Sequence, residues 1–137
     1  MNTETKSDAE LFNSSYERCQ SSPGFLERFY EIFLGSSAEV AEKFKHTDFA
    51  RQREVLKASL YMLMLASLGT PEALQHLERM AQLHSRKQLD IRPELYDLWL
   101  TCMLKAVKEH DRLFDDKTEQ AWRRVLQHGI EFIKARY

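Results

Sequence analysis

The chain is poor in residues that form tight turns: 4 of its 137 residues are glycine and 3 are proline. A β-sandwich or β-barrel turns every few residues, so this shortage excludes an all-β fold and favours long helices with few corners. The length is typical of one domain, which leaves room for a single core and no second catalytic module.

Neither sign of charge is in excess, because 20 Lys and Arg residues face 21 Asp and Glu residues, for a net charge of −1. This balance gives no support to nucleic acid or to an anionic membrane as a partner. The longest apolar run, Ala58 to Ala66, is far shorter than the roughly 20 residues that span a bilayer. We therefore expect neither nucleic acid nor a membrane among the partners.

Export and metal motifs are also missing. The N-terminus is polar and acidic, unlike a signal peptide. The two cysteines, Cys19 and Cys102, lie far apart and lack the spacing of a metal site. We expect them to be reduced, buried thiols, which indicates a cytoplasmic protein.

Capping residues and apolar periodicity predict six or seven helices in one all-α domain over residues 1–137, with a disordered tail at 1–7. Helix-start signals occur at Asp8, Ser22-Pro23, Thr47 or Asp48, Thr70-Pro71, Pro93-Glu94 and Asp116, with a short helical turn at 38–43. The helix at 48–68 is apolar nearly all round in its second half, which predicts a central position. The last two helices carry clean apolar stripes and are expected to pack as an antiparallel pair that floors a pocket.

Of the five histidines, His84 is the one that falls on an inward helix face close to a helix end. His76 belongs to the same predicted helix but lies about 100° or more from its apolar stripe, so its side chain is expected in solvent. Two interpretations of His84 remain open: a buried histidine bonded to a backbone carbonyl, and an axial ligand of a metal or haem.

Four stretches, in this order and spacing, resemble one known family. They are Phe25-Leu-Glu-Arg-Phe-Tyr-Glu-Ile-Phe, Lys43-Phe44, Gln52-Arg-Glu-Val-Leu56, and His84 followed by Ile91-Arg-Pro-Glu-Leu-Tyr96. Together they resemble the globins, in particular single-domain bacterial globins and the globin domain of flavohaemoglobins, over about residues 12–137. The resemblance implies a globin fold, with the helices packed three-on-three around a haem pocket.

The resemblance also implies roles for individual residues. His84 would ligate the iron of haem b, while Tyr30 and Gln52 would hydrogen-bond to bound O₂. Further haem contacts are expected from Phe44, Val55, Leu56, Leu77, Leu89, Ile91, Tyr96, Trp99 and Leu126, and propionate partners from Lys45, His46 and Arg86. Each has a plainer alternative: Tyr30 as a core residue, Gln52 as a surface residue, Phe44 as the anchor of a loop.

Two departures from the family pattern bear on the site. The interval from His84 to Ile91 is two residues longer than in flavohaemoglobins, which implies an insertion or an extra helical turn. Arg51 is adjacent to Gln52, so a slip of one residue would place an arginine in the distal position.

The function implied is reversible binding of O₂, and of CO or NO, by a monomer or homodimer with no catalytic residues. One alternative is NO dioxygenation with a separate reductase, because flavin and nicotinamide domains are absent from this chain. The other is a globin-fold sensor or interaction module that works without haem.

Overall fold

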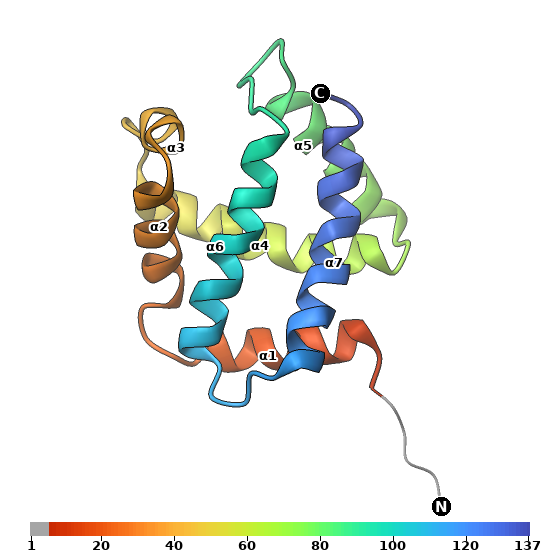
Figure 1. Cartoon of the computed structure of the whole chain (residues 1–137). Helices are drawn as coiled ribbons and strands as arrows, with labels where there is room; N and C mark the ends of the chain where they lie inside the picture. Colours follow the sequence, from red (N-terminus) through yellow and green to blue (C-terminus); the bar gives the residue numbers. More distant parts are fainter. Residues whose placement is uncertain (1–5) are drawn as a thin grey trace, which may run out of the picture.

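The computed structural model describes residues 6–137, which form seven α-helices and no strand (Figure 1). The helices are α1 (Asp8–Gln20), α2 (Phe25–Ser36), α3 (Ala38–Lys43), α4 (Phe49–Ser67), α5 (Pro71–His84), α6 (Glu94–His110) and α7 (Asp116–Lys134). The prediction of six or seven helices in an all-α chain is confirmed over these residues. Within the same range, no helix combines the length and apolar character that crossing a membrane requires.

Two helix starts differ from the sequence prediction. Helix α1 is capped by Ser7 rather than Asp8, because the Ser7 hydroxyl accepts from the Glu10 N–H and the Glu10 carboxylate accepts from the Ser7 N–H. Residues 1–5 of the predicted disordered tail lie outside the described part, and its last residue, Ser7, serves as the cap of α1. Helix α2 starts after Gly24, at a φ of 81°, and not at Ser22-Pro23.

The other starts agree closely with the sequence. Asp48 caps α4 through the Arg51 N–H, and Pro71 begins α5. Helix α7 is capped by Asp115, one residue before the predicted Asp116, because the Asp115 carboxylate accepts from the Thr118 N–H. Sequence and structure thus differ here by one residue.

Helix α4 crosses behind α6 and α7, which lie side by side (Figure 1). It approaches α7 so closely that a Cβ atom added to Gly129 would lie 2.2 Å from Leu63 Cδ2. The central position expected for α4 is therefore found. It is not covered on every side, since Tyr61 remains 52% exposed while Leu60 is fully buried.

A buried carboxylate joins α1 to the end of α6. Asp111, whose side chain is inaccessible, accepts hydrogen bonds from Ser15 Oγ at 2.6 Å and from Arg18 Nη2 at 3.0 Å. Trp122 of α7 donates to the same Ser15 hydroxyl at 2.9 Å. Burial raises the pKa of Asp111, but the bonds from Arg18 and Ser15 outweigh it and leave the pKa below its usual value.

Both cysteines are buried free thiols, as predicted. Burial raises the pKa of Cys19 to about 12, so this thiol stays protonated and unreactive near neutral pH.

Candidate functional site

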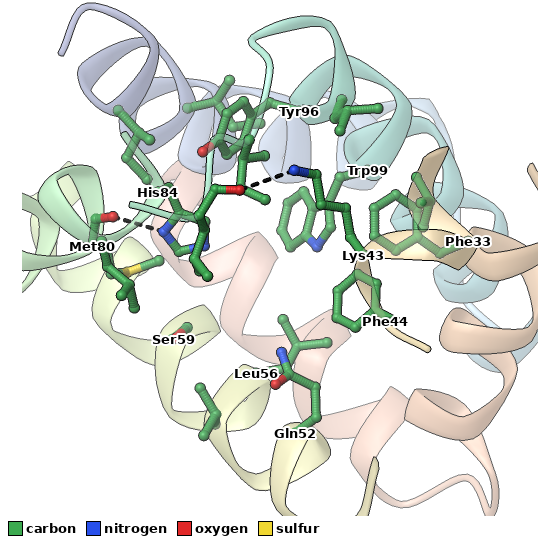
Figure 2. Close-up of a pocket in the computed structure, with 18 of the residues that line it drawn as sticks. Phe33, Lys43, Phe44, Gln52, Leu56, Ser59, Met80, His84, Tyr96 and Trp99 are labelled. Carbon is green, nitrogen blue, oxygen red and sulfur yellow. Dashed lines mark hydrogen bonds between the residues drawn. The ribbon is translucent and has the colours of Figure 1, made fainter. Parts of the chain in front are cut away.

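A cavity of about 560 Å³ opens between α4 and α5, and residues of α2, α3, α6 and α7 complete its lining (Figure 2). Its volume lies in the range of cofactor sites, and its walls are mostly apolar. Most of the site residues predicted from the sequence line it: Tyr30, Phe44, Gln52, Val55, Leu56, His84, Leu89, Ile91, Tyr96 and Trp99. The last two helices line the cavity through residues that include Trp99 and Ile130.

Two predicted contacts do not reach the cavity. Leu77 and Leu126 are fully buried and absent from its lining. Leu77 points instead toward α7, where its Cδ2 lies 3.5 Å from the Cβ position of Gly129. We correct both to core residues: an apolar stripe marks every inward position, whether it faces a neighbouring helix or a cavity.

The predicted propionate partners also lie elsewhere. Arg86 stacks over the ring of Tyr137 at 4.8 Å, and Lys45 pairs with Glu42. Neither they nor His46 line the cavity, whereas Lys43 and Arg79 do. The cations that line the cavity are therefore other residues than the three predicted from the sequence.

His84, the last residue of α5, lines the cavity and is oriented by its own helix. Its Nδ1 lies 2.7 Å from the carbonyl oxygen of Met80, one turn earlier (Figure 2). A carbonyl oxygen only accepts, so Nδ1 carries the hydrogen and Nε2 keeps a lone pair. This is the tautomer that an axial histidine needs, and the backbone bond holds the ring in place. The bond to the Met80 carbonyl therefore agrees with both interpretations of His84, as a histidine bonded to a backbone carbonyl and as a ligand of a metal or haem.

The opposite wall offers hydrogen-bond donors. Tyr30 of α2 is buried, with its ring centroid 5.9 Å from that of Phe44 and 5.3 Å from that of Phe49. Burial raises the pKa of Tyr30 to about 12, against the opposite effect of the Gln52 amide. The phenol therefore keeps its proton near neutral pH and acts as a donor.

Gln52, in the first turns of α4, faces the same cavity, and Figure 2 shows its amide beside Leu56. Arg51 is exposed and does not line the cavity. The helix phase thus places the amide, and not the guanidinium, at this wall.

The connection from α5 to α6, residues 85–93, closes one side of the cavity through Leu89 and Ile91. Its extra length forms hydrogen-bonded turns rather than an extra turn of helix, with Asp90 at a φ of 52°. An aspartate tolerates this left-handed conformation better than most residues. The longer interval seen in the sequence is therefore taken up within the loop.

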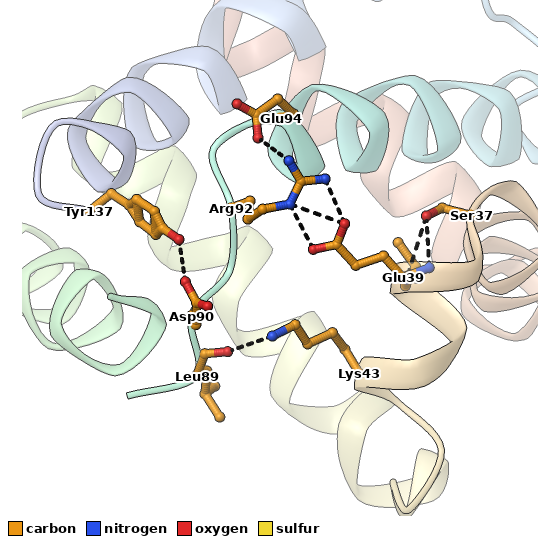
Figure 3. Close-up of polar contacts among 9 residues, drawn as sticks. Ser37, Glu39, Lys43, Leu89, Asp90, Arg92, Glu94 and Tyr137 are labelled. Atoms are coloured by element: carbon orange, nitrogen blue, oxygen red, sulfur yellow. Dashed lines mark hydrogen bonds and ion pairs between the residues drawn. The ribbon is translucent and has the colours of Figure 1, made fainter. Parts of the chain in front are cut away.

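Polar contacts from two directions hold this loop in place (Figure 3). From α3, Lys43 Nζ donates to the carbonyl oxygen of Leu89 at 3.0 Å. The Glu39 carboxylate accepts three bonds from Arg92, at 2.6, 2.9 and 3.1 Å. From the other side, the Tyr137 hydroxyl bonds to the Asp90 carboxylate. The side chains of α3 therefore help to close the cavity.

Sequence reasoning missed several residues that line the cavity. They are Phe33, Val40, Lys43, Thr47, Ser59, Leu63, His76, Arg79, Met80, Leu83, Leu95 and Ile133. The expectation of a solvated His76 is wrong, because this side chain is half-buried and faces the cavity. A usable signal was the spacing of His76, Met80 and His84, which puts them on neighbouring turns of one helix face.

Two buried polar side-chain atoms of residues 6–137 have no hydrogen-bond partner: Nε2 of His76 and the hydroxyl oxygen of Tyr96. Both residues line this one cavity. The Tyr96 ring centroid lies 6.3 Å from that of His84. Leaving a buried polar atom unpaired costs about 1–3 kcal/mol, so the cavity fits an occupant that brings polar groups of its own.

Comparison with known proteins agrees with this architecture. The globin family profile matches residues 27–133. Among solved structures, the chain is similar to a protein from Pseudomonas aeruginosa that is described as structurally highly homologous to a human hemoglobin. The two are 44% identical over 96% of this chain and 98% of that chain, with a TM-score of 0.92. No curated protein matches the chain. The expected globin fold is confirmed, and the chain belongs to the globin family.

Proposed function

We propose that this globin holds haem b in the cavity through His84 and binds O₂, CO or NO reversibly. The observation that carries the proposal is the bond between His84 Nδ1 and the Met80 carbonyl, which leaves Nε2 free to coordinate a metal. Haem held there would supply the iron chemistry that takes up these diatomic ligands.

The cavity fits haem in size and in chemistry. Its volume of about 560 Å³ and its apolar walls suit a porphyrin, and Phe44 offers an aromatic face at one end. Two cations, Lys43 and Arg79, line it and match the negative charge of the propionates. The residues present therefore fit the group that the family implies.

On the wall formed by α2 and α4, Tyr30 and Gln52 supply O–H and N–H donors to a bound ligand. O–H and N–H donors stabilise a ligand with partial negative charge, so these two side chains would favour bound O₂ over the less polar CO. Because Tyr30 keeps its proton, it remains a donor throughout the neutral range. These two residues would therefore slow the release of O₂.

The environment of His84 favours a binding protein. A carboxylate on Nδ1 would increase the electron donation of the imidazole, whereas the Met80 carbonyl is neutral and does so less. Haem held by a strongly donating residue would supply chemistry that cleaves an O–O bond, and haem held by a weaker donor would supply reversible binding. The neutral partner thus supports reversible binding, in a cytoplasmic protein whose iron a separate reductase would keep ferrous.

The proposal is tested by adding haemin to the purified protein and recording visible spectra of the ferrous and CO-bound forms. We expect stoichiometric uptake and a Soret band that shifts on reduction and again on addition of CO. His84→Ala should lose haem or hold it loosely, whereas His128→Ala, at an exposed position outside the cavity, should behave as the unaltered protein.

Equal haem retention and equal spectra in His84→Ala would reject the ligand assignment. A folded protein that takes up no haem would reject the proposed function and favour an interaction module.

A further inference from the structure

The middle of α5 contributes two polar side chains to the cavity that form no hydrogen bond or ion pair with other protein groups among residues 6–137. Nε2 of His76 is buried without a partner. Arg79, one turn later, forms neither an ion pair nor a side-chain hydrogen bond within the described part of the chain. Resting on the proposed function, we propose that His76 and Arg79 form a carboxylate subsite, which binds one propionate of the haem and fixes its orientation.

The subsite lies on the same helix face as His84 and at a distance from it. The residues of α5 that line the cavity include, at intervals of one to four residues along the helix, His76, Arg79, Met80 and His84. At about 1.5 Å per residue, the backbones of His76 and His84 are about 12 Å apart along the helix. His76 and His84 therefore serve different parts of one large ligand rather than the same atom.

The charges around the cavity favour an anion at this end. Among the described residues, no Asp or Glu lines the cavity, and its two lining residues with a permanent positive charge are Lys43 and Arg79. The Lys43 ammonium already donates to the Leu89 carbonyl at 3.0 Å. The guanidinium of Arg79 remains available, and its fork geometry matches a carboxylate.

The chemistry of His76 suits the same ligand. Burial, and then the charge of Arg79, lower its pKa, so the ring is neutral near pH 7 and carries a single N–H. With that hydrogen on Nε2, the buried atom donates to a carboxylate oxygen, and the penalty of leaving it unpaired is removed. His76 thus adds a short, directed contact beside the longer and exposed Arg79.

The experiment compares haem with haem dimethyl ester, in which neutral methyl esters replace both carboxylates. Soret titration measures the affinity of the protein for each porphyrin. For Arg79→Gln and for His76→Phe, we expect haem to bind about two- to tenfold more weakly and the diester to bind unchanged. His76→Gln, which keeps a side-chain N–H donor, should recover part of the loss. Arg51→Gln removes an exposed arginine outside the cavity and should change neither affinity.

Three results would overturn the subsite while leaving the proposed function in place. They are unchanged haem affinity in both variants, equal weakening for haem and diester, and a carboxylate-dependent loss seen only in Lys43→Gln. Uptake of neither porphyrin by the unaltered protein would overturn the proposed function and the subsite together. Circular dichroism of each apoprotein shows that the variants fold, so that an affinity loss reports on binding.

Discussion

Replacing Gly129 with alanine tests how closely α4 and α7 approach and links that approach to the cavity. The new Cβ would lie 2.2 Å from Leu63 Cδ2 and 3.5 Å from Leu77 Cδ2. Leu63 is buried and lines the cavity, so its side chain must rotate, and the open space is on the cavity side. We therefore expect Leu63 to be displaced into the cavity, toward the position proposed for the haem.

Two opposing contributions set the magnitude of this change. Overpacking of a buried site costs about 1–3 kcal/mol. In the opposite direction, alanine stabilises a helix by up to about 1 kcal/mol relative to glycine, because its helix propensity is higher. The free energy of unfolding of the apoprotein should therefore fall by about 1 kcal/mol, and the displaced Leu63 should also weaken haem binding.

The matched control is Gly35→Ala in α2, where an added Cβ would meet nothing within 4 Å. There the gain in helix propensity is unopposed, so stability should rise by about 0.5–1 kcal/mol. Urea unfolding of both apoproteins and haem titration of both variants provide the measurements. The reasoning is refuted if Gly129→Ala stabilises the protein as much as Gly35→Ala does and leaves haem affinity unchanged.

Three further predictions concern the buried carboxylate, the distal donor and the loop contacts. Asp111→Ala should destabilise the apoprotein by about 2–3 kcal/mol in urea, because Ser15 and Arg18 lose their shared acceptor. The pKa of Asp111 is lowered in the folded state, so the stability that this carboxylate contributes is present above its unfolded pKa of about 4 and is lost as pH falls through the folded value. The stability of the variant should therefore depend less on pH in acid. An acid dependence equal to that of the unaltered protein would contradict this. Tyr30→Phe should speed O₂ release about two- to tenfold in stopped flow and leave CO release nearly unchanged; equal effects on both gases would remove Tyr30 as a donor. Arg92→Gln, which breaks the bidentate contact with Glu39, should speed haem loss to an excess of apomyoglobin a few-fold at low salt and less at high salt, and a salt-independent effect would argue against an ionic contact.

The helices could be predicted because their signals are local. Asp48 and Pro71 mark helix starts through bonds or dihedral preferences within a few residues. The start at Ser22-Pro23 was wrong because of a distant contact: the Ser22 hydroxyl lies 2.7 Å from Nδ1 of His110 and does not cap a helix. A side chain that has both a local and a distant partner cannot be assigned from its neighbours in sequence.

The cavity was predicted only in part for a similar reason. Apolar periodicity locates the faces turned inward. It selected His84 and Leu56, which line the cavity, and also Leu77, which packs on α7. Polar residues that line a cavity, such as His76 and Arg79, follow no apolar stripe. They became visible only when the structure showed two helices separated by a space that side chains do not fill.

The central claim is that the imidazole of His84 coordinates the haem iron, and resonance Raman spectroscopy of the ferrous, ligand-free protein tests it most directly. We expect an iron–imidazole stretching band in the unaltered protein, its loss in His84→Gly, and its return when free imidazole is added to that variant. A band that persists in His84→Gly without added imidazole would show that another residue holds the iron and would contradict the account.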